Sequence, residues 1–213
     1  MIYWTPPKIW RGQDCYIIGG GPSLQMFDWE LLRPRHTIGC NAAFKLGHEI
    51  CEICVFGDYS FLGTFEDELK TWEGLVVTNL PVPFTRDRAW IRQMRRIPKG
   101  LATGDALAWN SNTGAVAINL ALSLGVARVF LLGFDMTLRD GKSNWHTHST
   151  CKNPNNAAVY PRFIRGFAKL KKALDADFPD RQVINLVGSE GSELGDFPRE
   201  SLEEHFALEG ATA

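Results

Sequence analysis

Residues 15–24, CYIIGGGPSL, form a short apolar run that breaks into Gly19, Gly20, Gly21, Pro22 and Ser23. This pattern predicts a buried strand followed by a loop at its carboxyl end, the edge where parallel sheets bind ligands. Glycines let a backbone approach a ligand closely, Pro22 can set a first helical turn and Ser23 adds a hydroxyl, so the loop suits a phosphate. A tight strand-to-helix turn without a ligand would use the same residues. The loop is neither a Walker loop nor a regular GxGxxG, which disfavours a P-loop kinase or a routine dehydrogenase.

Other apolar runs resemble the first and extend the pattern along the chain. They are HTIGCN, ICVFGD, LVVTNL, ARVFLLGFD and RQVINLVG, starting at residues 36, 53, 75, 127 and 181. Helical patterns cover 113–125, closed by Gly125, and 160–179, with Pro161 near the start. We therefore predict a single α/β domain over 1–213, with a Rossmann-like, doubly wound, mostly parallel sheet and helices on both faces. Residues 81–105 are the least regular and are expected to form an insertion or a lid, and 207–213 a tail.

Composition narrows the class of protein. The 213 residues carry 23 basic and 24 acidic side chains, so no overall field attracts nucleic acid or an anionic membrane. No apolar run reaches the length of a membrane span, and the first residues lack a signal pattern, which predicts a cytoplasmic protein. Five scattered cysteines indicate reduced thiols. Cys51 and Cys54 have a CxxC spacing, but no second pair completes a zinc site, so we expect packed thiols there.

Small polar side chains follow three further strands, at the predicted carboxyl edge. They are Asn41, Asp58 and Asp135. Asn112 or Thr113 would cap the long helix, and Gly114 would leave its first turn open to an anionic or carbonyl group. Each residue alone fits a loop or cap role, but together they predict one ligand site.

The ordered motifs IIGGGPSL, GCNAAF, VFGDYS, TGAVAINLALSLGVARVFLLGFD and HTHS cover most of residues 14–150. In this order they resemble the bacterial lipo-oligosaccharide sialyltransferases and a related domain family of unknown function. That wider family includes flagellin glycosyltransferases, the archaeal hydroxymethylpterin diphosphokinase and many phage or prophage members, which this compact chain is similar to. The resemblance implies nucleotide binding by the glycine loop, Asn41, Asp58, Thr113 and Gly114. Gly20 and Asp58 stand where the sialyltransferases have asparagines.

The resemblance also implies the chemistry. It makes His148, followed by Ser149, the general base of a glycosyltransferase that moves a sugar from a nucleotide-activated donor to a hydroxyl acceptor, with no further cofactor. His146 and Asp135 complete the candidate catalytic set. The family's two tyrosines that assist phosphate departure are replaced by Thr137 and by Asn144 or Trp145. A sialic acid donor is therefore disfavoured, and Arg139, Lys142 or the helix end at Thr113 would meet the leaving phosphate.

Two alternatives use the same residues differently. A diphosphokinase or other nucleotide-using transferase would need Mg²⁺, held by carboxylates such as Asp58 and Asp135. A nucleotide-binding protein would keep the site without turnover. Separately, His146, His148 and Cys151, with Asp135 nearby, are competent zinc ligands, although a site without metal is the preferred interpretation.

Residues 86–100 hold the densest positive charge, at three- and four-residue spacing. The set comprises Arg88, Arg92, Arg95, Arg96 and Lys99. A helix would place them on one side, beside Trp90, as an anion or acceptor patch for a phosphorylated glycan or modified DNA. The alternative is a solvated helix face paired with acidic residues such as those in 65–70.

Overall fold

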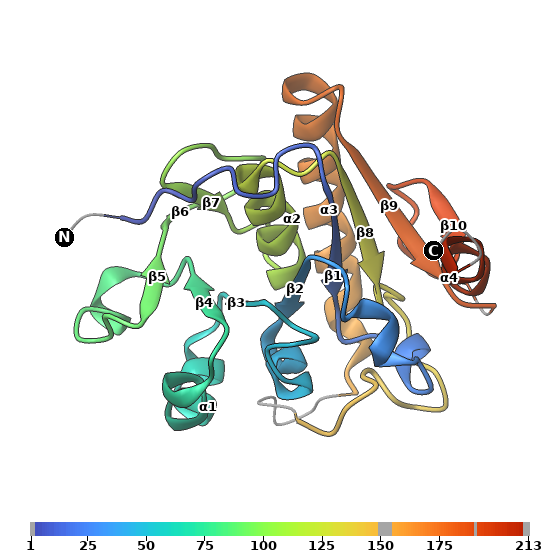
Figure 1. The fold of residues 1–213 in the computed structure, drawn as a ribbon, viewed down its shortest axis with the longest axis horizontal. Helices are drawn as coiled ribbons and strands as arrows, with labels where there is room; N and C mark the ends of the chain where they lie inside the picture. Colours follow the sequence, from blue (N-terminus) through green and yellow to red (C-terminus); the bar gives the residue numbers. More distant parts are fainter. Residues whose placement is uncertain (1–2, 149–154, 190, 211–213) are drawn as a thin grey trace.

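The computed structural model describes residues 3–148, 155–189 and 191–210. One sheet dominates the fold, with strand order β10-β9-β8-β1-β2-β3-β4-β5, and all its neighbouring strands pair in parallel (Figure 1). Its strands are β1 (Asp14–Ile18), β2 (Thr37–Cys40), β3 (Ile53–Phe56), β4 (Leu75–Thr78), β5 (Ile91–Gln93), β8 (Arg128–Leu132), β9 (Gln182–Val187) and β10 (Arg199–Ser201). β6 (Arg95–Ile97) and β7 (Ala106–Ala108) form a second, two-stranded sheet. Because the chain winds outward in both directions from β1, the switch point lies between β1 and β8.

Alternate residues of the central strands are buried on opposite faces. Cys15 and Ile17 pack with α2 (Thr113–Leu124) and α3 (Tyr160–Asp177), whereas Tyr16 and Ile18 face α4 (Leu202–Gly210). α1 (Tyr59–Thr71) covers β3 and β4 on the face opposite α2. Burial on both sides explains the continuous apolar runs. The predicted α/β fold with helices on both faces is confirmed (Figure 1).

Helix α2 is the buried centre of the fold and begins and ends as its sequence predicts. Asn112 is the N-cap and its Oδ1 accepts a hydrogen bond from the Ala115 N–H at 2.6 Å, while Gly125 ends the helix at a φ of 96°. One polar residue, Asn119, lies on the buried side. Its Oδ1 accepts from the N–H groups of Ala102 and Ala108, so this amide ties the small sheet to the helix.

Short 3-10 turns lie in the connections between strands, and one of them leads into α3. They are η1 (Pro22–Leu24), η2 (Trp29–Leu32), η3 (Asn41–Leu46), η4 (Val82–Phe84) and η5 (Ala157–Val159). Pro22 therefore starts a single turn, not a helix long enough to carry a dipole. In the part of the chain that the structure describes, no helix combines the length and the apolarity needed to cross a bilayer.

The helix predicted for the basic stretch is wrong. The stretch forms the edge strand β5 and the strand β6, because Ile91 and Gln93 are buried while Arg92 between them is exposed, an alternation of period two. Arg88 is paired in bidentate fashion with Glu66, at 2.7 and 2.8 Å. Arg95 pairs with Asp105, and Arg96 turns inward, so these arginines do not form one surface patch.

The described cysteines support the packed-thiol interpretation. Cys15, Cys40, Cys51 and Cys54 are free and buried. Burial raises the pKa of the Cys51 thiol to about 12 and holds the Cys54 thiol well above its usual range. Such thiols stay protonated at neutral pH and are poor metal ligands.

The contact between α3 and the loop before α2 gives a test of the fold. A Cβ on Gly166 would lie 2.0 Å from the backbone oxygen of Asn110, so Gly166→Ala should destabilise the protein by about 2–3 kcal/mol. The control is Gly63→Ala, on the exposed side of α1 with no atom within 4 Å of the new methyl, which should be neutral or stabilising by about 0.5–1 kcal/mol. Urea unfolding of both variants measures the difference. Equal stabilities would contradict the close approach of α3 to this loop.

Candidate functional site

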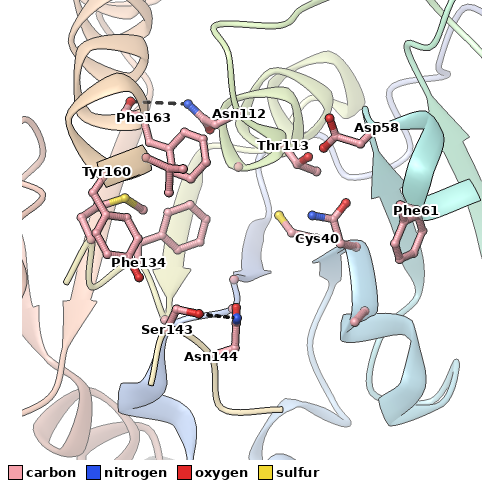
Figure 2. Close-up of a pocket in the computed structure, with 18 of the residues that line it drawn as sticks. Cys40, Asp58, Phe61, Asn112, Thr113, Phe134, Ser143, Asn144, Tyr160 and Phe163 are labelled. Carbon is pink, nitrogen blue, oxygen red and sulfur yellow. Dashed lines mark hydrogen bonds between the residues drawn. The ribbon is translucent and has the colours of Figure 1, made fainter. Parts of the chain in front are cut away.

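A cavity of about 580 Å³ opens at the carboxyl edge of the sheet (Figure 2). Loops after β1, β2, β3 and β8 line it, together with the first turns of α1, α2 and α3. Eight of the predicted binding and catalytic residues meet there: Gly19, Gly20, Asn41, Asp58, Thr113, Gly114, His146 and His148. Gly21, Pro22, Ser23 and Asp135 do not line the cavity, and nor does any residue of 81–105, a segment that is described throughout.

The glycine loop is held against the loop after β8. The N–H groups of Gly19, Gly21 and Ser23 donate to the Leu132 oxygen, the Gly133 oxygen and Oδ2 of Asp135, each at 2.8 Å. A Cβ on Gly21 would lie 2.5 Å from the Gly133 oxygen. The glycines thus allow two backbones to approach each other. The prediction that this loop binds a phosphate is corrected in one respect. These three N–H groups already donate within the protein and are not available to a ligand.

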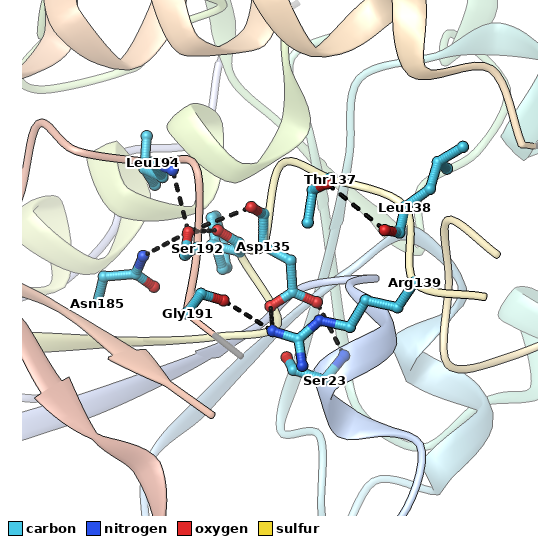
Figure 3. A network of polar contacts seen from close by, with 10 residues as sticks. Ser23, Asp135, Thr137, Leu138, Arg139, Asn185, Gly191, Ser192 and Leu194 are labelled. Carbon is cyan, nitrogen blue, oxygen red and sulfur yellow. Dashed lines mark hydrogen bonds and ion pairs between the residues drawn. The ribbon is translucent and has the colours of Figure 1, made fainter. Parts of the chain in front are cut away.

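Asp135 belongs to a buried network behind the cavity (Figure 3). Only 2 % of the residue is exposed, and Oδ1 lies 3.7 Å from the Arg139 guanidinium, which also donates to the Gly191 oxygen. The Asp135 backbone oxygen accepts from the Glu193 N–H at 2.8 Å. Its contacts fasten three loops together. In this structure Asp135 therefore holds the loops behind the cavity in place, a supporting role and not the catalytic role expected from the sequence.

Asp58 has a different environment. It is the N-cap residue of α1, but its side chain does not cap that helix. Partial burial raises the pKa of the Asp58 carboxyl, whereas the positive charges of Arg96 and Arg162 act to lower it. In Figure 2 this carboxylate is directed toward the end of α2 that carries Thr113. Asp58 is thus a carboxylate presented to the cavity.

Asn41 begins η3 with a φ of 52°, a left-handed conformation that asparagine tolerates better than most residues. Its side-chain oxygen is buried and has no hydrogen-bond partner among the described residues. Ser111 and Met136, which also line the cavity, have φ values of 65° and 54°. Backbone strain of this kind gathers at functional sites.

The first turn of α2 is only partly open. A Cβ on Gly114 would lie 2.5 Å from Cε1 of Phe134, so the phenyl ring rests directly on this turn. Thr113, the preceding residue, is 7 % exposed and lines the cavity. The sequence predicts that Gly114 leaves the start of α2 open to a ligand. Phe134 covers this turn at Gly114, and the turn meets the cavity at Thr113.

Trp145 positions the histidine pair. Its backbone N–H donates to the Gly20 oxygen and its indole N–H to the Gly19 oxygen, both at 2.9 Å. The rings of His146 and His148 follow with centroids 6.0 Å apart. Burial, aided by the charge on His148, lowers the pKa of His146 to about 4, so His146 is neutral at pH 7. Its Nδ1 is buried and meets no partner within the described ranges.

The zinc interpretation gains no support. Within residues 3–148, 155–189 and 191–210, no group of three His, Cys, Asp or Glu side chains could hold a metal ion. Cys151, and Ser149 of the predicted base motif, lie outside the described residues. The magnesium pair of the diphosphokinase alternative is also separated, because Asp135 is enclosed in its own network while Asp58 faces the cavity.

The sequence analysis missed the aromatic and cationic wall supplied by the start of α3. Tyr160, Arg162 and Phe163 line the cavity there, and Figure 2 shows Tyr160 and Phe163 on the side opposite Asp58. Phe134, Met136 and Phe167 extend the apolar part. The signal was present as YPRF at 160–163, because a proline in the first turn marks a helix start and aromatic residues there are free to meet a ligand.

Comparison with known proteins assigns no relative to this arrangement. No family model, curated protein or solved structure matches the chain. The function is therefore argued from the cavity alone.

The depressed pKa of His146 makes stability depend on pH. Between about pH 6.5 and 4 the unfolded chain binds a proton that folded His146 does not, so the free energy of unfolding should fall as pH falls through this window. In His146→Gln the loss between pH 7 and pH 4.5 should be smaller by about 1–2 kcal/mol, allowing for partial exposure. Urea unfolding at the two pH values measures this. An unchanged pH dependence would show that His146 is not desolvated in the fold.

Proposed function

We propose that the cavity binds a nucleotide-activated donor and that the protein transfers its sugar to an acceptor hydroxyl, with His148 as general base. The observation that carries this proposal is the meeting of the eight predicted residues, spread over 130 positions, around one cavity. Ligands of open parallel sheets bind at this edge. The resemblance in motif order supplies the reaction class.

The lining suits a ligand with two unlike parts. Phe134, Phe163 and Tyr160 offer flat surfaces to a ring (Figure 2), while Asn41 and Thr113, which also line the cavity, offer hydrogen-bonding groups. A cavity of about 580 Å³ lies within the range of small-molecule sites. A nucleotide, with a planar base and polar sugar and phosphates, fits this division.

In the proposed step His148 removes the proton of the acceptor hydroxyl as its oxygen bonds to the anomeric carbon of the donor sugar. The bond from that carbon to the nucleotide phosphate breaks, and the phosphate leaves with the electron pair. His146 does not compete for the proton, because its pKa of about 4 makes it a weak base at neutral pH.

The charge on the leaving phosphate needs a cation. Of the three candidates from the sequence, only the helix end at Thr113 lines the cavity; Arg139 and Lys142 do not, and Arg139 is bonded to the Gly191 oxygen. Arg162 lines the cavity from the first turn of α3 and takes this role in the proposal. A guanidinium at this position stabilises charge that grows as the bond breaks.

No specific observation favours either alternative function, the diphosphokinase or the nucleotide-binding protein without turnover. The diphosphokinase depends on a carboxylate pair, and Asp135 is turned away into its buried network. A binding protein without turnover would use the same cavity, so only kinetics separates it from the transferase.

Thermal-shift measurements with nucleoside diphosphates, with and without Mg²⁺, test nucleotide binding. His148→Ala should then reduce donor turnover in the presence of acceptor by about 100-fold or more, with nucleotide affinity unchanged. His48→Ala is the control, because this histidine is exposed and pairs with Glu73 away from the cavity. Equal turnover in His148→Ala and wild type would reject the base. Binding that required Mg²⁺, with adenosine triphosphate preferred, would favour the diphosphokinase, and binding without any turnover would favour the third class.

A further inference from the structure

The guanidinium of Arg96 lies inside the wall behind Asp58, not on the surface patch predicted from its neighbours. Its Nε donates to the backbone oxygen of Asn79 at 2.9 Å, and Nη2 donates to Oδ1 of the same residue at 3.0 Å. Nη2 also donates to the Gly57 oxygen at 2.5 Å. Arg96 therefore joins the loop after β4 to the residue directly before Asp58.

Trp109 completes this assembly. Arg96 stacks over its ring at 4.4 Å, and a Cβ on Gly57 would lie 2.1 Å from Cζ3 of that ring. Trp109 itself lines the cavity. The indole is thus in close contact with both the guanidinium and the backbone that carries Asp58, which leaves the loop after β3 little freedom.

We infer that Arg96 is a positioning residue that fixes the Asp58 carboxylate at the cavity as an ionised acceptor for the paired hydroxyls of a ribose or other sugar in the donor. This inference rests on the proposed function and specifies the part of the ligand that Asp58 recognises. Arg96 itself does not line the cavity, so it acts through Asp58 and the backbone of Gly57.

The occupant expected at Asp58 is a neutral hydroxyl donor and not a cation. Two guanidinium groups, Arg96 from β6 and Arg162 from α3, already act on this carboxylate. Asp58 does not cap α1, and no other hydrogen bond to its carboxylate oxygens is present among the described residues. A carboxylate whose charge is offset but whose lone pairs are unused suits O–H donors.

The electrostatics support the same role. Partial burial raises the pKa of Asp58, and the charges of Arg96 and Arg162 oppose that rise. Without Arg96 the effect of burial is less opposed, and the carboxyl protonates at a higher pH. Sugar recognition would then weaken as pH falls, because a protonated carboxyl accepts hydrogen bonds poorly.

The first experiment measures the Asp58 pKa by carbon-13 NMR in wild type, Arg96→Met, Arg96→Lys and Arg95→Met. Arg95 is the matched control, since it lies next in sequence and pairs with Asp105 at the surface. The pKa should rise in Arg96→Met and stay near the wild-type value in Arg96→Lys and Arg95→Met. An unchanged pKa in Arg96→Met would overturn the electrostatic part of the role without reference to any nucleotide. If Arg96→Met does not fold, the neutral variant Arg96→Gln takes its place, and a raised Asp58 pKa supports the charge effect while an unchanged pKa overturns it.

The second experiment compares the affinity of the best-binding nucleoside diphosphate with that of its 2′-deoxy and 3′-deoxy analogues by calorimetry. Wild type should prefer the full ribose by about 10- to 100-fold, and Asp58→Asn should lose most of this preference. Arg96→Lys keeps the charge but not the planar fork, so it should weaken binding of the ribose form by about tenfold with the Asp58 pKa unchanged.

The outcomes separate the two proposals. Nucleotide binding without any ribose preference would overturn the inference and leave the proposed function standing. If no nucleotide binds wild type, the proposed function fails, and the sugar-recognition role of Asp58 fails with it. Ribose preference retained in Asp58→Asn would assign the hydroxyls to another residue and overturn the inference. Binding of Mg²⁺ alone, lost in Asp58→Asn, would identify a cation site in its place.

Discussion

The hydrogen bonds between the loop after β1 and the loop after β8 decide where a ligand can bind. In a doubly wound sheet these two loops diverge at the switch point and leave a crevice. Here the N–H groups of Gly19 and Gly21 donate to the β8 loop, and Ser23 donates to Asp135, which narrows that crevice. The cavity opens beside these bonds and is lined by both of these loops, by the loops after β2 and β3 and by the starts of α2 and α3. The glycine loop fixed in this way also accepts both hydrogen bonds of Trp145, which holds the histidines at the cavity.

The cavity combines a rigid scaffold, formed by helix α2, with a rim of residues in strained backbone conformations. Helix α2 is buried along nearly its whole length, and Asn119 ties it to the small sheet, so its first turn is a fixed platform. The rim of the cavity holds the left-handed Asn41, Ser111 and Met136. Conformations of this kind cost about 1–3 kcal/mol each and persist only where the surroundings determine them. A firmly packed scaffold therefore supports a strained rim, an arrangement suited to holding polar groups toward a ligand.

Strands and helices were predictable where burial dictates the sequence. Continuous apolar runs identified the central strands, and Ala and Leu with a closing Gly125 identified α2. The basic stretch was misread because arginines at three- and four-residue spacing also satisfy a strand in which Arg92 points outward. Glycine is needed both where a backbone approaches a phosphate and where it approaches another loop. The sequence therefore could not show that Gly21 lies against the loop after β8. The contribution of Tyr160 and Arg162 was missed because their position depends on how α3 packs, which no local pattern contains.

Two carboxylates that follow strands of the same sheet show why burial, and not residue type, separates a supporting role from ligand recognition. Asp135 and Asp58 both follow strands and both have an arginine nearby. Asp135 is enclosed, and its oxygens contact Ser23 and Arg139, so it fastens loops behind the cavity. Asp58 has its charge offset from behind while its oxygens face the cavity. An exposed carboxylate that is to accept hydrogen bonds from a ligand needs nearby positive charge that favours its ionised form and leaves its acceptor atoms uncovered. Arg96, bonded to the backbone on the far side of Asp58, meets that requirement.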